Sequence, residues 1–147
     1  MKTVNDILLR KGPPFNVIEP DASVVDALSL MSCENLDHVI VMIGDHYLGI
    51  LCEHDYTRKL LVPGIDLQHV KVREIMNSYL PILSMDESLE RCMKLMDQFH
   101  TRHLPVFDEM VFRGVITMDD IIKEAVFNRD IFDLDRPEVA VTELGLH

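Results

Sequence analysis

Thr117 and Asp120 are the residues of this sequence whose types and spacing could do chemistry together. They stand at the expected start of a helix, where Thr-x-x-Asp is nearly a capping box, with Thr117 capping the helix and Asp120 bonding back. The same two side chains, with the positive end of the helix dipole beside them, could instead hold a small polar ligand. The sequence leaves both interpretations open, and one pair of residues can serve both.

Seven histidines raise the question of a metal site. His100 and His103 are only three residues apart, but they straddle the expected end of a helix and the start of a strand. No second pair of ligands converges on them in the sequence, so we expect no metal. Together with Arg102, these histidines either form a modest basic rim that could meet phosphate or are simply solvated.

The rest of the sequence gives little support for catalysis. It has no nucleophile in a recognised elbow, no glycine-rich phosphate loop and no paired carboxylates within a supporting motif. An enzyme is therefore the least favoured class, and no catalytic residue is assigned.

Composition limits the partners. The chain has 147 residues, and 48% of them are apolar, which suffices for a packed core. Its net charge of -11 disfavours binding to nucleic acids and to anionic membranes. No apolar run is long enough to cross a membrane, and the first residues lack a signal-peptide pattern. The three cysteines, Cys33, Cys52 and Cys92, lack metal-type spacing, so we expect free thiols in a cytoplasmic protein.

The elements that must position these residues come from an internal repeat. Residues 20–31 align with residues 85–96 without gaps, at an offset of 65. In both copies apolar side chains recur at positions i, i+3, i+4 and i+7, which predicts one face of a helix. These side chains are Val24, Ala27, Leu28 and Met31 in the first copy, and Leu89, Cys92, Met93 and Met96 in the second. A cap acceptor stands before each helix, Asp21 or Ser23 and Asp86 or Ser88.

Two strands follow at the same offset in each copy. Residues 38–41 and 49–51 correspond to residues 103–106 and 114–116, and both sets read as paired short strands. Gly44-Asp45 is a plausible hairpin turn in the first copy, with Asp108-Glu109 near the equivalent place in the second.

A further helix completes each copy, beginning near Glu53 and near Met118. The second of these helices has an expected apolar face of Ile121, Ile122, Ala125 and Val126. Short lead-ins, residues 4–8 and 72–76, precede the copies at an offset of 68. Each copy is thus an α+β unit in the order lead-in, β-α-β-β-α, and two such units are expected to pack sheet to sheet.

The helix starts, the strand Arg102-His103-Leu104-Pro105-Val106 and the two glycine-led turns from strand into helix closely resemble a pair of tandem CBS domains. We place the repeats at residues 1–62 and 72–126, a linker at 63–71 and an acidic tail at 127–147. The resemblance implies a Bateman module, in which two repeats related by a pseudo-two-fold axis enclose two clefts. Such clefts commonly hold adenosine-containing ligands, and such modules usually pair into homodimers.

The resemblance also implies which residues bind the ligand. The family motif of glycine, two apolar residues, Ser or Thr, two variable residues and Asp is matched by residues 114–120. Asp120 would accept the two hydroxyls of a ribose, while Thr117 and the helix start would meet a phosphate. The other residues implied in binding are Leu80, Pro81 and Ile82 with their counterparts Val17 and Ile18, which flank the adenine, and Arg102, His103 and Pro105.

The first copy departs from this motif. Cys52 stands where a hydroxyl is expected, although Asp55 keeps the acid. Asp37 stands where the second copy has Arg102, which replaces a charge that attracts phosphate by one that repels it. Arg58, beside Lys59, supplies cations near this cleft. We expect the second site to be the binding site.

The function that follows is a regulatory module that senses the energy or cofactor state of the cell and modulates an unknown protein in trans. AMP, ADP or ATP is the expected ligand, as an effector and not as a required cofactor. NAD(H) and S-adenosylmethionine share the same adenosine and stay open. The alternative is a ligand-independent dimerisation or scaffold module, in which Thr117 and Asp120 merely cap a helix.

Overall fold

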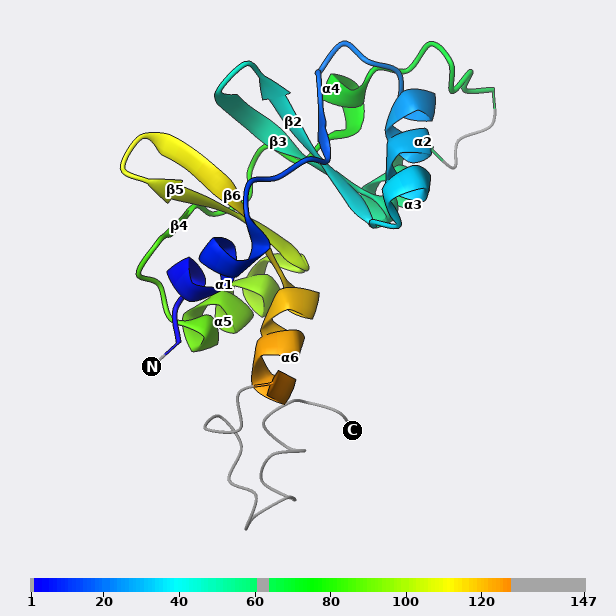
Figure 1. Cartoon of the computed structure of the whole chain (residues 1–147). Coiled ribbons are helices and arrows are strands. Elements are labelled where there is room, and N and C mark those ends of the chain that lie inside the picture. Colours follow the sequence, from blue (N-terminus) through cyan, green and yellow to red (C-terminus); the bar gives the residue numbers. More distant parts are fainter. Residues whose placement is uncertain (1, 61–63, 128–147) are drawn as a thin grey trace, which may run out of the picture.

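The computed structural model describes residues 2–60 and 64–127, which form two units of the same design (Figure 1). The first unit contains α1 (Val4–Lys11), β1 (Val17–Ile18), α2 (Val24–Glu34), β2 (His38–Ile43), β3 (His46–Cys52) and α3 (Glu53–Leu60). The second unit contains α4 (Val72–Ile75), β4 (Leu83–Ser84), α5 (Leu89–Phe99), β5 (His103–Asp108), β6 (Val111–Thr117) and α6 (Met118–Phe127). The α+β order predicted from the repeat is confirmed. Of the expected linker and tail, residue 63 and residues 128–147 lie outside the described residues.

Each unit has one three-stranded sheet, in the order β1-β2-β3 and β4-β5-β6. The short first strand runs parallel to the second, and the second and third strands form an antiparallel hairpin. His38 pairs with Cys52 and His103 pairs with Thr117, so the register itself repeats at the offset of 65. The hairpin of the first unit turns at Gly44, with a φ of 56°, and that of the second turns at Glu109, also at 56°. The second turn therefore begins one residue later than expected, because Asp108 still belongs to β5.

Helices α2 and α5 begin and end alike. Ser23 and Ser88 cap them, each accepting a hydrogen bond from the amide three residues on, at 3.0 and 3.1 Å. Both helices end at a left-handed residue, Asn35 and His100. The expected apolar faces of both helices are buried, apart from Leu28 and Met93, which are half-buried. No helix among the described residues is long and apolar enough to cross a membrane.

The buried face of α6 differs from the expected one. Ile121 and Ala125 are buried, whereas Ile122 and Val126 are exposed. The third buried residue of the helix is Glu124, which is only 2% exposed. Its carboxylate is paired with Arg10 of α1, so a charged pair between helices replaces part of the apolar contact.

The two lead-in helices are exchanged between the units. Val4, Ile7 and Leu8 of α1 lie in the core of the second unit, with Leu83, Leu104 and Ile116 among their neighbours. Val72 and Ile75 of α4 lie in the core of the first unit. Backbone hydrogen bonds fix both arrangements, from Val4 N to Glu87 O at 3.0 Å and from Val72 N to Ala22 O at 2.9 Å. Figure 1 shows α1 beside α5, and α4 near α2. Each unit therefore completes the core of the other.

The two sheets also pack against one another, as the exposed sheet faces of single units predict. Ile40 of β2, Ile50 of β3 and Val115 of β6 form a separate buried cluster between the units. At its edge Tyr47 stacks on Phe112, with ring centroids 4.9 Å apart, and meets the edge of Phe107 at 5.7 Å. Together with the exchanged helices, this second contact resists sliding of one unit along the other.

Candidate functional site

Thr117 and Asp120 form a reciprocal hydrogen-bonded pair where β6 passes into α6. The Thr117 amide donates to Asp120 Oδ2 at 2.9 Å, and the Asp120 amide donates to Thr117 Oγ1 at 3.0 Å. Two amides that the first turn of α6 leaves without helical partners are thereby satisfied. The pair therefore caps α6, and both side chains remain partly accessible to solvent.

Lys11, which the sequence analysis did not single out, forms an ion pair with the Asp120 carboxylate. Its ammonium donates to Asp120 Oδ2 at 2.8 Å and to the carbonyl oxygen of Val115 at 2.9 Å. Lys11 is the last residue of α1, so the cation comes from the first unit and the acid from the second. Because α1 and α6 are more than a hundred positions apart, no local pattern could have indicated this contact. The Asp120 carboxylate therefore contacts residues of both units.

The flanking segments connect the exchanged lead-in helices back to the sheets of their own units. The chain runs from Lys11, which contacts Asp120, to Val17 and Ile18 of β1 in the sheet of the first unit. The segment that leads to residues 80–82 starts on the first unit. There the backbones of Asn77 and Ile50 exchange two hydrogen bonds, of 2.8 and 3.0 Å. The strand here begins at Leu83, so these three residues lie ahead of it. Leu80 is half-buried between the cores, and Ile82 is 62% exposed.

The equivalent position in the first unit is weaker as a polar site. The Cys52 amide and thiol both approach Asp55 Oδ2, at 3.5 and 3.2 Å. Burial raises the pKa of the Cys52 thiol to about 11, so it stays neutral. At the lead-in offset of 68, the counterpart of Lys11 is Tyr79, which is 89% exposed. Arg58 is exposed on α3, while Lys59 donates to the carbonyl oxygen of Ile75 at 2.8 Å.

The proposed basic rim of His100, Arg102 and His103 does not form as a unit. His103 is buried and its Nε2 lies 3.0 Å from Asp37 Oδ1. Arg102 is exposed and pairs with Asp119 at 3.4 Å, and His100 is the exposed C-cap of α5. The strand geometry explains the separation, because Arg102 precedes β5 whereas His103 and Pro105 lie within it and are buried.

Asp37, His38 and His103 form a compact cluster where β2 and β5 begin. Asp37 Oδ1 lies 3.1 Å from His38 Nδ1, and the two imidazole rings are 4.4 Å apart. Hydrogen bonds from His103 and His38 hold the pKa of Asp37 well below its usual range. Burial lowers the pKa of His38. Asp37 was expected to repel phosphate, but in the structure it serves to join the two units.

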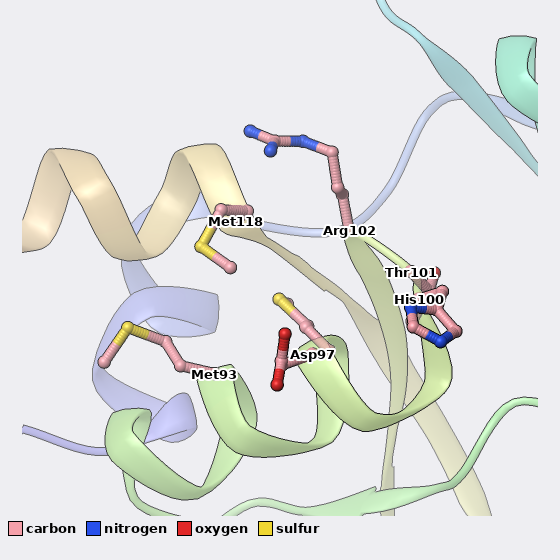
Figure 2. Close-up of a pocket in the computed structure, with 7 residues that line it drawn as sticks. Met93, Asp97, His100, Thr101, Arg102 and Met118 are labelled. Carbon is pink, nitrogen blue, oxygen red and sulfur yellow. The ribbon is translucent and has the colours of Figure 1, made fainter. Parts of the chain in front are cut away.

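A hollow of about 260 Å³ opens beside the start of α6 (Figure 2). Its lining residues are Met93, Met96, Asp97, His100, Thr101, Arg102 and Met118. In Figure 2 the Met93 and Met118 side chains and the Asp97 carboxylate lie between α5 and α6. Thr117 and Asp120 are not among the lining residues, so this hollow does not include the pair of Lys11 and Asp120.

Comparison with known proteins identifies the two units. The family model of the CBS domain matches residues 4–62 and 72–126. A mitochondrial CBS domain-containing protein of Arabidopsis thaliana, CBSX3, is 28% identical over 133 residues, which cover 84% of this chain and 65% of that protein. In a second curated relative, from Methanocaldococcus jannaschii, the matched region covers 64% of that protein. The chain therefore spans just under two thirds of the length of these two relatives.

Solved structures show the same architecture. A putative signal-transduction protein with CBS domains from Burkholderia ambifaria is 30% identical, with a TM-score of 0.81 over 87% of this chain and 96% of that one. A hexameric CBS-CP12 protein from bloom-forming cyanobacteria is 26% identical, with a TM-score of 0.73 over 94% of this chain and 79% of that one. Two tandem repeats of one domain type, related as in these proteins, therefore account for nearly all described residues.

Proposed function

This chain belongs to the CBS domain family, and we propose that it is a regulatory module that binds an adenosine-containing ligand in the cleft at Asp120. CBS-domain pairs generally serve regulation or signal transduction, which is the function that the family membership gives directly. The observation that carries the finer proposal is the contact of Lys11 with Asp120. It sets an acceptor for hydroxyl groups beside a cation suited to phosphate, and both side chains are accessible to solvent.

Binding would proceed by exchange of partners. The hydroxyls of a ribose can donate to the Asp120 carboxylate in place of the Lys11 ammonium, and the released ammonium can then meet a phosphate of the same ligand. The cap formed by Thr117 and the amide of Asp120 does not need Lys11, so α6 keeps its start. This exchange favours a phosphorylated ligand such as AMP, ADP or ATP over free adenosine.

The same exchange would couple the ligand to the arrangement of the two repeats. Lys11 belongs to the exchanged helix α1, and its neighbour Arg10 pairs with the buried Glu124 of α6. A ligand in the cleft therefore changes one of the two ion pairs between α1 and α6. Its effect on a partner is limited by the difference in its affinity for the two arrangements.

The first-repeat cleft is the weaker candidate. Asp55 faces a neutral thiol instead of a hydroxyl, and the lead-in supplies Tyr79 where the other cleft has Lys11. A phosphorylated ligand would gain less there, because a thiol is a poor donor and no lead-in cation accompanies the acid. We therefore propose one high-affinity site per chain.

The setting of the module is also part of the proposal. Three free cysteines suit a reducing compartment such as the cytoplasm. The hexameric cyanobacterial relative supports assembly of this chain into a homodimer or a larger homo-oligomer. The regulated protein would be supplied in trans.

Thermal unfolding with AMP, ADP, ATP, NADH and S-adenosylmethionine tests the proposal. A ligand at about 100 times its dissociation constant stabilises the chain by about 2.7 kcal/mol, or roughly 5–10 °C. Asp120→Asn should remove the shift, measured from its own ligand-free midpoint. Asp119→Asn is the matched control, because Asp119 is adjacent but exposed and paired with Arg102. If no ligand shifts the wild-type chain, the adenosine proposal is wrong.

The alternative is a ligand-independent dimerisation or scaffold module. The hydrogen bonding among Thr117, Asp120 and Lys11 favours it, since Asp120 Oδ2 and the Lys11 ammonium are already paired without a ligand. In that case Asp120→Asn would lower the midpoint of unfolding in the same way with and without nucleotides.

A further inference from the structure

One cluster of metal-ligating side chains takes no part in the cap of α6 or in the proposed adenosine site. It consists of Asp37, His38 and His103. Its two imidazole nitrogens and one carboxylate oxygen all lie within 4.8 Å of one another. The Asp37 Oδ1 atom is 3.1 Å from His38 Nδ1 and 3.0 Å from His103 Nε2. Nitrogen and oxygen donors of this kind suit Zn²⁺ and other late first-row divalent metals.

The spacing of these atoms is close to that of a metal site. Zinc bonds to imidazole nitrogen and carboxylate oxygen measure about 2.0–2.2 Å, which puts the ligand atoms of a tetrahedral site about 3.3–3.6 Å apart. The two distances from Asp37 are a few tenths of an ångström shorter than this, and the ligand atoms all lie within 4.8 Å of one another, so Asp37 would move slightly away from the histidines and the two rings would adjust around an ion. The ring nitrogens that now donate to Asp37 would give up their protons when the metal binds, and each histidine would carry its proton on the other ring nitrogen, as a neutral metal ligand does.

Symmetry explains why two histidines from distant positions meet here. His38 and His103 are equivalent residues at the offset of 65, and their rings are in contact at 4.4 Å. Equivalent residues that touch must lie on the pseudo-two-fold axis between the repeats. The third ligand breaks the symmetry, because the counterpart of Asp37 is Arg102, which is exposed and pairs with Asp119. One ion per chain, with at least one coordination position left open, is the expected stoichiometry.

Charge and access are compatible with a cation. His38 and His103 are 5% and 4% exposed, whereas the Asp37 side chain is 48% exposed and gives an ion a route from solvent. Together with burial, the positive charge of Lys11 contributes to the lowered pKa of His38, and the Lys11 ammonium is hydrogen-bonded to Asp120 and to the carbonyl oxygen of Val115. Asp37 supplies the negative charge that an ion needs, and the hydrogen bonds from both histidines stabilise its ionised form.

We propose that Asp37, His38 and His103 bind one zinc-like divalent metal ion that joins the two repeats at their pseudo-two-fold axis. The proposal does not depend on nucleotide binding at Asp120. The sequence analysis considered His100 as the partner of His103, but the structure places His100 at the exposed end of α5. The actual partner comes from the other repeat, which spacing along the chain could not indicate.

Metal titration of the untagged, chelator-treated full chain tests the proposal. Zn²⁺ is added in competition with a chromophoric chelator, and Co²⁺ is followed by its visible absorption. One ion per chain is expected, with a tetrahedral or five-coordinate cobalt spectrum that lacks a strong thiolate band. Bound Zn²⁺ should also raise the midpoint of thermal unfolding, because the ion binds only the folded arrangement.

His103→Gln should weaken Zn²⁺ binding at least about 100-fold, since loss of a direct ligand exceeds the 10–100-fold effect of outer-shell partners. Asp37→Asn keeps both imidazoles and the side-chain size, and should weaken Zn²⁺ binding by at least 10-fold. If His103→Gln does not unfold cooperatively, Asp37→Asn serves as the test of the metal site in its place. His69→Gln is the matched control, because His69 Nδ1 lies 2.6 Å from Asp66 Oδ2 in an exposed pair without a second histidine. Wild-type binding no tighter than that of Asp37→Asn, or an equal loss in His69→Gln, would overturn the proposal.

Discussion

Replacement of Lys11 by Met tests the contact between the repeats most sharply. Methionine keeps most of the apolar stem of lysine and removes the ammonium, which donates to Asp120 and to the carbonyl oxygen of Val115. The Asp120 side chain is 15% exposed and that of Lys11 is 35% exposed, so the ion pair is only partly screened by water. We expect a loss of about 1–2 kcal/mol in the free energy of unfolding, after allowance for this exposure.

Urea and thermal unfolding measure this loss. For a chain of this length, 1–2 kcal/mol corresponds to a fall of about 3–6 °C in the midpoint. A double-mutant cycle with Asp120→Asn isolates the pair, and its coupling energy should be about 1 kcal/mol. Lys94→Met is the matched control, because Lys94 and Glu90 form an exposed pair on one face of α5, 3.3 Å apart, that should contribute less than about 0.5 kcal/mol.

Additive effects of Lys11→Met and Asp120→Asn would refute the reasoning, since they would mean that the two groups do not interact in solution. A loss from Lys11→Met no larger than that from Lys94→Met would do the same. The variant also separates the two roles given to Lys11. If the ammonium must leave Asp120 before a ribose binds, Lys11→Met should bind free adenosine more tightly while losing preference for ATP.

The remaining predictions concern packing and thiol chemistry. Gly49→Ala should lower the free energy of unfolding by about 1–3 kcal/mol, because the added carbon would lie 2.7 Å from the backbone oxygen of Asn77, as urea unfolding can show; a change within about 0.5 kcal/mol would contradict the close approach. An aromatic disulfide reagent at pH 8 should modify Cys33 alone in the folded chain. Burial raises the pKa of Cys52 to about 11 and that of Cys92 to about 12, so rapid reaction of more than one thiol before unfolding would be inconsistent with the structure.

Most of the local structure could be predicted because it depends on short-range patterns. The apolar spacing that begins at Val24 and Leu89, with a serine before each helix, is sufficient to locate α2 and α5. The repeat then carries each assignment from one copy to the other. The apolar face of α6 was predicted less well, because the burial of Glu124 depends on Arg10, a residue far away in the sequence.

Apart from the packing of sheet against sheet, the contacts between the repeats could not be predicted. An internal repeat shows which residues are equivalent, but not which lead-in packs on which core. The contact of Lys11 with Asp120 follows from that exchange. The meeting of His38 with His103 depends on the axis that relates the repeats, and the sequence gives no position for that axis.

The most direct test of the adenosine proposal is the number of nucleotides bound per chain. Equilibrium dialysis with the ligand that gives the largest thermal shift should find one high-affinity site in the wild-type chain and in Asp55→Asn. The same measurement should find none in Asp120→Asn at that concentration. Binding that survives Asp120→Asn, or that is lost in Asp55→Asn instead, would contradict a ligand site built from Asp120 and Lys11.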